Sequence, residues 1–150
     1  MSTAAASTAA ASESASTPAP TGGLHIGLWV AQILLALPFT AAGLFKLTTP
    51  LADLTAKMAW IASAPAFLPR FIGLSELLGG IGLILPAATR IQPRLTPLAA
   101  LGLLVIMILA ALFHASRGEW HSLPVNIVLG AIAGFIAWGR LRQAPIPPRS

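Results

Sequence analysis

Four polar side chains stand within or at the end of long apolar stretches of this sequence: Lys46, Glu76, His114 and Asn126. A carboxyl group can hold or pass a proton, whereas an ammonium, an imidazole and a carboxamide can donate hydrogen bonds to a ligand oxygen. An ionisable group inside a bilayer costs at least ~2.5 kcal/mol, so it normally faces protein and has a partner. Their chemistry therefore depends on whether the fold brings them together.

Glu76 is the most informative of the four. An isolated carboxylate in hydrocarbon protonates unless a cation or several donors stabilise it. The cations available to it are Lys46, His114 and Arg70. A structural ion pair and a proton-transferring group both explain this residue. For the other three, snorkelling of Lys46, helix capping by His114 and an interhelical hydrogen bond from Asn126 are the structural alternatives.

The composition indicates which elements must position these residues. Hydrophobic residues make up 56% of the 150 residues, charged residues only 9%, and the mean hydropathy is +0.82. Soluble domains carry about 25% charged residues. The nine Lys and Arg residues give a net charge of +5, but they are scattered between apolar runs and form no basic stripe. The composition thus favours a membrane protein in contact with lipid and argues against nucleic-acid binding.

Four apolar runs predict four transmembrane helices. They cover residues 24–45, the stretch between Arg70 and Arg90, residues 95–113 and residues 122–139. Each is close to the ~20 helical residues that cross a ~30 Å hydrocarbon core. We therefore predict an all-α membrane domain over residues 24–142, folded as a four-transmembrane-helix bundle. It is flanked by a disordered low-complexity tail, residues 1–23, and a short C-terminal tail, residues 143–150.

The connection between the first two spans predicts a short interfacial helix. Thr49 suits its N-cap and Pro50 its first position, and Asp53 and Lys57 have the spacing of an i, i+4 ion pair. Apolar residues share one face of this helix: Leu51, Leu54, Met58 and Ile61. Burial of that face in the membrane surface and packing against the end of the bundle remain alternatives.

The up-and-down order of the spans predicts a shared pocket. It places Lys46, Glu76, His114 and Asn126 in the same half of the membrane, one on each helix. Glycines accompany two of them, because Gly73 and Gly80 share a face with Glu76, and Gly130 and Gly134 share a face with Asn126. Such faces allow helices to pack closely.

The distribution of basic residues predicts the orientation. The side with both termini holds five arginines, whereas the other side holds four basic residues offset by Asp53 and Glu119. The first set is Arg90, Arg94, Arg140, Arg142 and Arg149, and the second is Lys46, Lys57, Arg70 and Arg117. The positive-inside rule then predicts a multi-pass protein of the cell membrane with both termini in the cytoplasm.

Several kinds of site are excluded or disfavoured. There is no cysteine, so disulfides, thiol chemistry and thiolate-bound metals are absent. One histidine and one glutamate make half a coordination shell, which predicts no metal site, and His25 and His114 should lie at opposite surfaces, which disfavours a bis-histidine haem. Phosphate-binding loops and hydrolase triads are also absent. We predict no intrinsic cofactor and assign no catalytic residue.

Two segments resemble the DoxX-like family of small four-helix membrane proteins: FTAAGLFKL at residues 39–47, and GLSELLGGIGLILPAATRIQPRLTPLAALGLLVIM at residues 73–107. His114, Asn126 and the pair Gly139–Arg140 extend the resemblance, which covers roughly residues 26 to 142. It implies that Lys46, Glu76, His114 and Asn126 match the recurring polar positions of the family. DoxX and DoxD are named for a membrane subunit linked to thiosulfate:quinone oxidoreduction, and other relatives are associated with redox-stress complexes or with assembly of membrane partners.

Two functions follow as hypotheses. In the first, the protein is a membrane subunit of a redox system and binds a quinone, or a similar lipid-soluble small molecule, in the polar pocket. Its partners are then the bilayer and a redox protein, and it is at most a subunit of an oxidoreductase that carries no cofactor of its own. In the second, it is a non-catalytic, chaperone-like assembly partner in which Glu76 and Asn126 hold the bundle together. Both hypotheses are compatible with a homo-oligomer.

Overall fold

A computed structural model describes residues 22–149, and four long helices account for most of them: α1 (Gly22–Thr48), α3 (Leu68–Thr89), α4 (Leu95–Ser116) and α5 (Leu123–Trp138). Each is long and apolar enough to cross a membrane, α5 together with the turns that flank it. The predicted all-helical, four-span architecture is confirmed. The predicted disordered tail lies outside the described residues, except for Gly22 and Gly23, which begin α1.

A short helix follows the first span, as predicted. It consists of α2 (Leu51–Lys57) and the 3₁₀ turn η1 (Ala59–Ser63). Its start was predicted wrongly: Pro50, not Thr49, is the N-cap, because a ψ of 145° keeps Pro50 extended and helical geometry begins at Leu51. Leu54 and Ile61 are buried, so the apolar face packs against protein. The Lys57 ammonium lies 5.1 Å from the centre of the Phe45 ring, and no ion pair joins Lys57 to Asp53.

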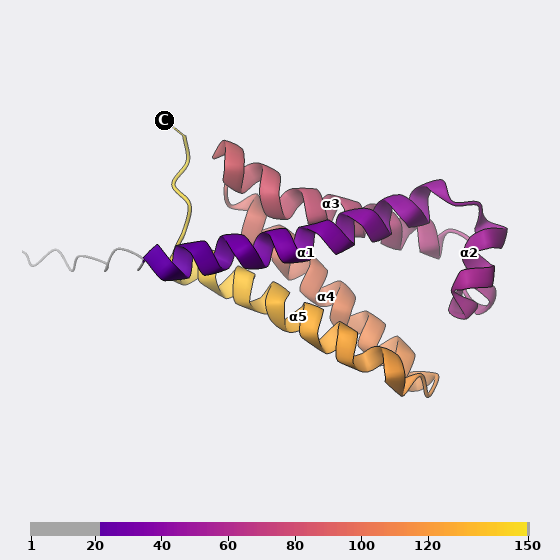
Figure 1. Ribbon diagram of the computed structural model, residues 1–150. Helices are drawn as coiled ribbons and strands as arrows, with labels where there is room; N and C mark the ends of the chain where they lie inside the picture. Colours follow the sequence, from indigo (N-terminus) through magenta and orange to yellow (C-terminus); the bar gives the residue numbers. More distant parts are fainter. Residues whose placement is uncertain (1–21, 150) are drawn as a thin grey trace, which may run out of the picture.

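The four long helices run alternately up and down (Figure 1). Gly22 and the C-terminal segment lie at one end of the bundle, which we call the terminal end. The opposite end carries α2, η1 and the turn between α4 and α5, including the 3₁₀ turn η2 (Trp120–Ser122), and we call it the loop end. At the terminal end, α5 continues into a π-helical turn, η3 (Gly139–Gln143).

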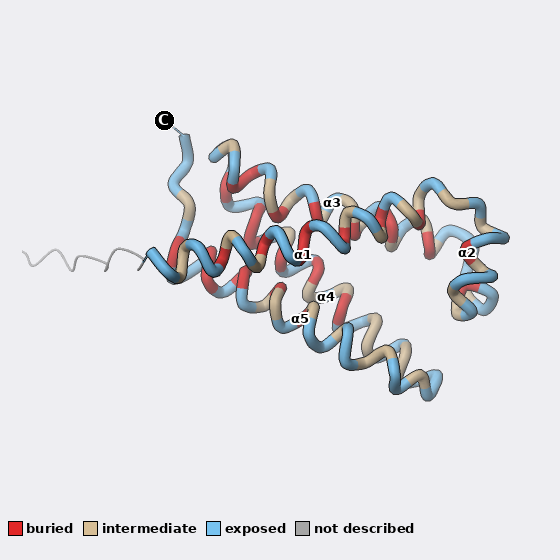
Figure 2. The backbone as a smooth tube through the Cα atoms, viewed as in Figure 1, coloured by how far each residue is buried: buried red, intermediate tan, exposed pale blue. Residues whose placement is uncertain are grey.

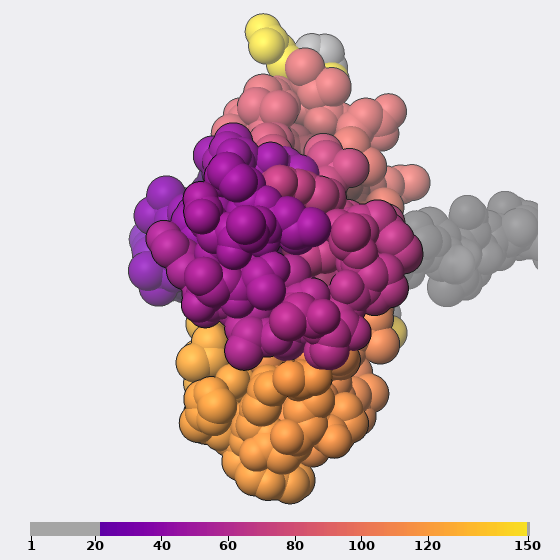
Figure 3. Space-filling model, turned by 90° about the vertical axis from the view of Figure 1, so that its right-hand side faces the viewer, coloured from indigo at the N-terminus to yellow at the C-terminus, as the bar shows by residue number. Residues whose placement is uncertain are grey.

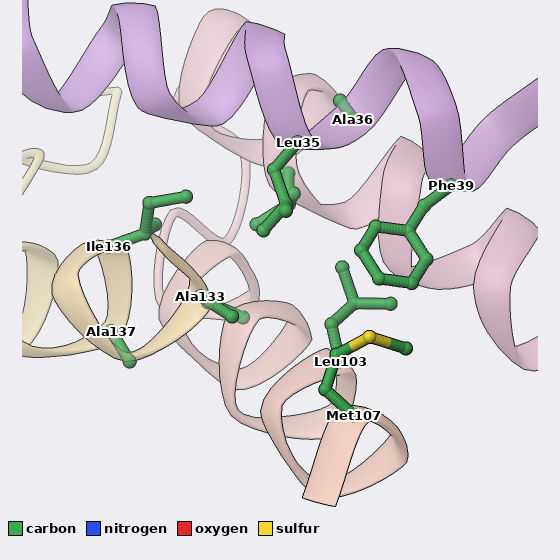
Figure 4. Packing of buried hydrophobic residues seen from close by; sticks show 10 residues of the cluster. Leu35, Ala36, Phe39, Leu103, Met107, Ala133, Ile136 and Ala137 are labelled. Carbon is green, nitrogen blue, oxygen red and sulfur yellow. The ribbon is translucent and has the colours of Figure 1, made fainter. Parts of the chain in front are cut away.

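The hydrophobic core joins all four long helices. Figure 4 shows side chains of α1, α4 and α5 converging on one another, with Leu35, Phe39, Leu103 and Ile136 among them, and Leu83 adds the contribution of α3. These residues lie in the middle of the bundle and toward its terminal end. Large apolar residues elsewhere remain exposed, as lipid-facing helices require. Figure 2 shows exposed residues, in pale blue, along each of the four long helices.

The bundle opens toward the loop end. There the pair α1–α3 diverges from the pair α4–α5 (Figure 1). Figure 3 views the molecule from the loop end and shows the segment around α2 and η1, in magenta, beside the end of the α4–α5 pair, in orange. An edge-to-face contact between the rings of Trp60 and Phe113, with centres 6.0 Å apart, ties η1 to α4. The two helix pairs are thus connected through the short helical segment as well as through the core.

Glycines allow a closer approach of the helix backbones in the pair α1–α3 than in the pair α4–α5. On α1, a Cβ added at Gly43 would lie 2.6 Å from the backbone oxygen of Gly73, and one added at Gly80 on α3 would lie 3.0 Å from that of Ala36. Added at Gly130 or Gly134 on α5, it would be 3.4 Å or more from its nearest neighbour, which is ordinary contact. The backbones of α1 and α3 are therefore in closer contact at these glycines than those of α4 and α5.

Candidate functional site

A buried ion pair connects α1 to α3. The ammonium of Lys46, in the last turn of α1, donates a hydrogen bond to a carboxylate oxygen of Glu76 at 2.7 Å, and both residues are less than one-tenth exposed. Gly73, one turn before Glu76, allows this approach, because a Cβ there would lie 2.7 Å from that of Lys46. Of the three cations that the sequence suggested as partners of Glu76, Lys46 is the one that forms an ion pair with it.

Arg70 has a different role. Its guanidinium donates one hydrogen bond to the backbone oxygen of Lys46 and another, at 2.8 Å, to that of Thr49. The last carbonyl groups of a helix have no partners within the helix and carry partial negative charge. Arg70 therefore caps the end of α1 from α3, directly beside the ion pair, and holds the two helices together at a second point.

His114 belongs to a separate cluster at the loop end. Its Nδ1 atom lies 2.6 Å from a carboxylate oxygen of Glu119, and Arg117 donates to the other oxygen at 2.7 Å. The hydrogen bond from Arg117 and then that from His114 hold the pKa of Glu119 below its usual range. Arg117 also donates to the Ser63 hydroxyl of η1 at 2.9 Å. The cluster thus joins the α4–α5 turn to the short helical segment.

Asn126 lines a surface groove between α4 and α5. The groove holds about 320 Å³. Apart from Asn126 its lining is apolar and rich in small residues: Leu104, Met107, Ile108, Ala111, Ile127, Gly130, Ala131 and Gly134. The Nδ2 atom of Asn126 is buried and has no hydrogen-bond partner. A free donor beside an apolar groove is an arrangement that a ligand carbonyl can complete.

All four predicted residues lie in the loop-end half of the bundle, but their contacts separate them. Lys46 and Glu76 bind each other between α1 and α3, whereas His114 and Asn126 lie on the α4–α5 pair among other neighbours. Their role in ligand binding stays a prediction. Within residues 22–149, no three His, Asp or Glu side chains gather as metal ligands.

Sequence reasoning missed a polar cluster at the terminal end. Arg140 of η3 is 3% exposed and donates from Nε to the side-chain oxygen of Gln32 at 2.7 Å, and Gln32 donates to the backbone oxygen of Leu83 at 2.6 Å. Another Arg140 nitrogen lies 3.3 Å from Nδ1 of His25. The available signal was Gln32, a polar residue in the middle of the first apolar run.

Comparison with known proteins identifies one family. The model of the DoxX-like family matches residues 30–136, well over half of the chain. No curated protein and no solved structure matches this chain. The matched segment includes Lys46, Glu76, His114 and Asn126, and it ends before Arg140.

Proposed function

This chain belongs to the DoxX-like family, and on that premise we propose that it is a membrane subunit of a redox system that binds a quinone or a similar lipid-soluble carbonyl compound. The observation that carries the proposal is the groove between α4 and α5, with the unpaired carboxamide of Asn126 beside it.

The groove suits a molecule of this class in size and polarity. Pockets for small organic ligands typically hold about 300–1,000 Å³ and combine an apolar lining with a few placed polar groups. Here the volume is about 320 Å³, and Ile108 and Ile127 on its rim are exposed on the outer surface, so a ligand dissolved in lipid reaches it laterally. The ring and tail of a quinone contact the apolar lining. One carbonyl oxygen accepts a hydrogen bond from Asn126 when its carboxamide turns to bring the buried Nδ2 atom into the groove.

The other polar residues take supporting roles in this proposal. Lys46 and Glu76 satisfy each other and fix α1 against α3. His114, the one titratable residue of α4, lies one helical turn beyond Ala111, which lines the groove. The chain contributes the binding site and a partner protein contributes the electrons. Both termini face the cytoplasm, because the terminal end carries the five arginines of the positive-inside pattern.

Binding of radiolabelled decylubiquinone to the full chain in nanodiscs tests the proposal. The Gly134→Leu substitution fills the groove and should abolish saturable binding. Asn126→Leu removes one hydrogen bond, worth about 1 kcal/mol, and should weaken binding about five- to tenfold. The control is Gly102→Leu on α4, where an added Cβ meets nothing within 4 Å. Wild-type protein without saturable binding, or full binding by Gly134→Leu, would refute the proposal.

The small residues of the same groove favour a second candidate function, the assembly of a partner membrane protein. Gly130, Ala131 and Gly134 leave room along α5, and such faces accept a neighbouring helix. Cross-linking in native membranes separates the two functions. A partner protein that is captured by the wild type and by Gly102→Leu but lost in Gly134→Leu, together with no quinone binding, assigns the groove to assembly.

A further inference from the structure

We infer that Arg140 is the centre of an anion site at the terminal end and that it binds the negatively charged phosphate group of a membrane lipid or of free phosphate. The starting observation is a buried cation without a counter-ion. Arg140 is 3% exposed, and its Nη2 atom is buried with no hydrogen-bond partner. Its other contacts are a carboxamide oxygen, a backbone oxygen, an imidazole and the ring of Trp29, whose centre lies 5.5 Å from the guanidinium carbon, and none of these groups carries a negative charge.

No carboxylate among the described residues can neutralise Arg140. The acidic side chains within residues 22–149 are Asp53 on α2, Glu76 in the loop-end half of α3 and Glu119 in the α4–α5 turn, so all of them belong to the opposite half of the bundle. Removing a guanidinium from water without an anionic partner is costly, so burial at this place favours an anion that is not among residues 22–149.

Around Arg140, hydrogen-bond donors outnumber the acceptors that can pair with them. The indole of Trp29 donates to Nε2 of His25 at 3.1 Å, while Arg140 approaches Nδ1 of the same ring at 3.3 Å. Indole and guanidinium groups can only donate, and a neutral imidazole accepts at only one of its nitrogens. The ring of His25 therefore cannot satisfy both groups. At least one donor besides Nη2 is left for an external acceptor.

Phosphate chemistry fits the position of the site. Arg140 is the second residue after α5, in the turn η3 at the end of a membrane span, which is the depth of lipid headgroups. Exposed arginines surround this end of the bundle: Arg90, Arg94, Arg142 and Arg149. The C-terminal segment folds back over it, since the backbone N–H of Arg149 donates to the Arg90 oxygen at 3.1 Å. A planar guanidinium matches two phosphate oxygens, and the segment from Ala144 onward must shift to admit them.

The melting temperature of the full chain in detergent tests the inference with two probes. The first is micelles containing dioleoyl phosphatidylglycerol, compared with dioleoyl phosphatidylcholine, and the second is inorganic phosphate, compared with sodium chloride at equal ionic strength. At a hundredfold excess over Kd, binding should raise the melting temperature by roughly 5–10 °C. A rise with the anionic lipid alone identifies a headgroup. An equal rise with inorganic phosphate identifies the free ion.

Arg142→Gln is the matched control, because it removes the same charge from an exposed residue two positions away. We expect Arg142→Gln to keep the shift and Arg140→Gln to lose it. Equal losses in both variants, or no shift with either probe in the wild type, would overturn the inference, and the wild-type comparison holds even if Arg140→Gln fails to fold. Glu13 is the one acidic residue of the N-terminal tail. If Glu13→Gln is as destabilising as Arg140→Gln and no probe shifts the melting temperature of the wild type, the partner is the chain's own N-terminal tail, and the inference is wrong.

Discussion

At the scale of single residues, the two most buried cations of this protein are in opposite situations. Lys46 has a carboxylate at 2.7 Å, whereas Arg140 has only neutral acceptors among residues 22–149. A buried ion pair contributes little net stability compared with apolar side chains of the same volume, but the loss of one partner leaves an uncompensated charge. The change in stability on substituting one partner therefore reflects mainly the cost of the buried charge that is left unpaired.

Glu76→Gln should lower the free energy of unfolding by about 3–5 kcal/mol, because it leaves the Lys46 ammonium buried without a counter-charge. Unfolding by urea in mild detergent measures the change. The double variant Lys46→Met, Glu76→Leu removes both charges and should recover most of the loss. If Glu76→Gln is as stable as the wild type, or if the double variant is no more stable than the single one, the pair does not have the structural role described here.

At the scale of elements, the hydropathy of the sequence predicted the number and positions of the helices, because these depend on the length and composition of the apolar runs. It could not predict the rotation of each helix about its own axis. The four spans, their order and the half of the membrane that holds Lys46, Glu76, His114 and Asn126 followed from the sequence. The choice of Lys46 over His114 and Arg70 as the partner of Glu76 did not. That choice depends on the close approach of α1 to α3 and on the divergence of α4 and α5 from them.

Two glycine substitutions test the difference in packing between the helix pairs. Gly80→Ala places a Cβ against the Thr40 hydroxyl and 3.0 Å from the backbone oxygen of Ala36, and it should cost about 1–3 kcal/mol of unfolding free energy. Gly134→Ala has 3.9 Å to its nearest neighbour and should be neutral, or stabilising by up to about 1 kcal/mol through helix propensity. Urea unfolding of both variants measures this. Equal effects of the two would contradict the assignment of α1–α3 as the tighter pair.

At the scale of the whole molecule, polar and aromatic contacts join segments of the loop end that are distant in sequence. Arg117 binds both Glu119 and Ser63, and Trp60 packs against Phe113. Sequence reasoning left open whether the short helix lies on the membrane surface or against the bundle. It could not identify these contacts, because they depend on how far the two helix pairs diverge.

The contacts of Glu119 with Arg117 and His114 at the loop end should weaken in acid. Since Arg117 and His114 hold the pKa of Glu119 below its usual value of 4.5, this carboxylate stabilises the folded state at neutral pH, and the contribution disappears as the pH falls through the lowered pKa. The melting temperature recorded between pH 6 and pH 3 should fall more steeply for the wild type than for Glu119→Gln. Parallel curves would mean that Glu119 does not stabilise this end.

The contact between Gln32 and Arg140 spans 108 positions of the chain, and this has a consequence for biosynthesis. Gln32 can reach the Leu83 carbonyl as soon as α3 has been inserted, but its own oxygen finds its donor only after the ribosome has completed α5. The pair α1–α3 can therefore assemble early, while the terminal end stays unfinished until synthesis is almost over. A chain interrupted before residue 140 lacks the donor for the Gln32 oxygen and keeps an unmatched amide oxygen within its first helix.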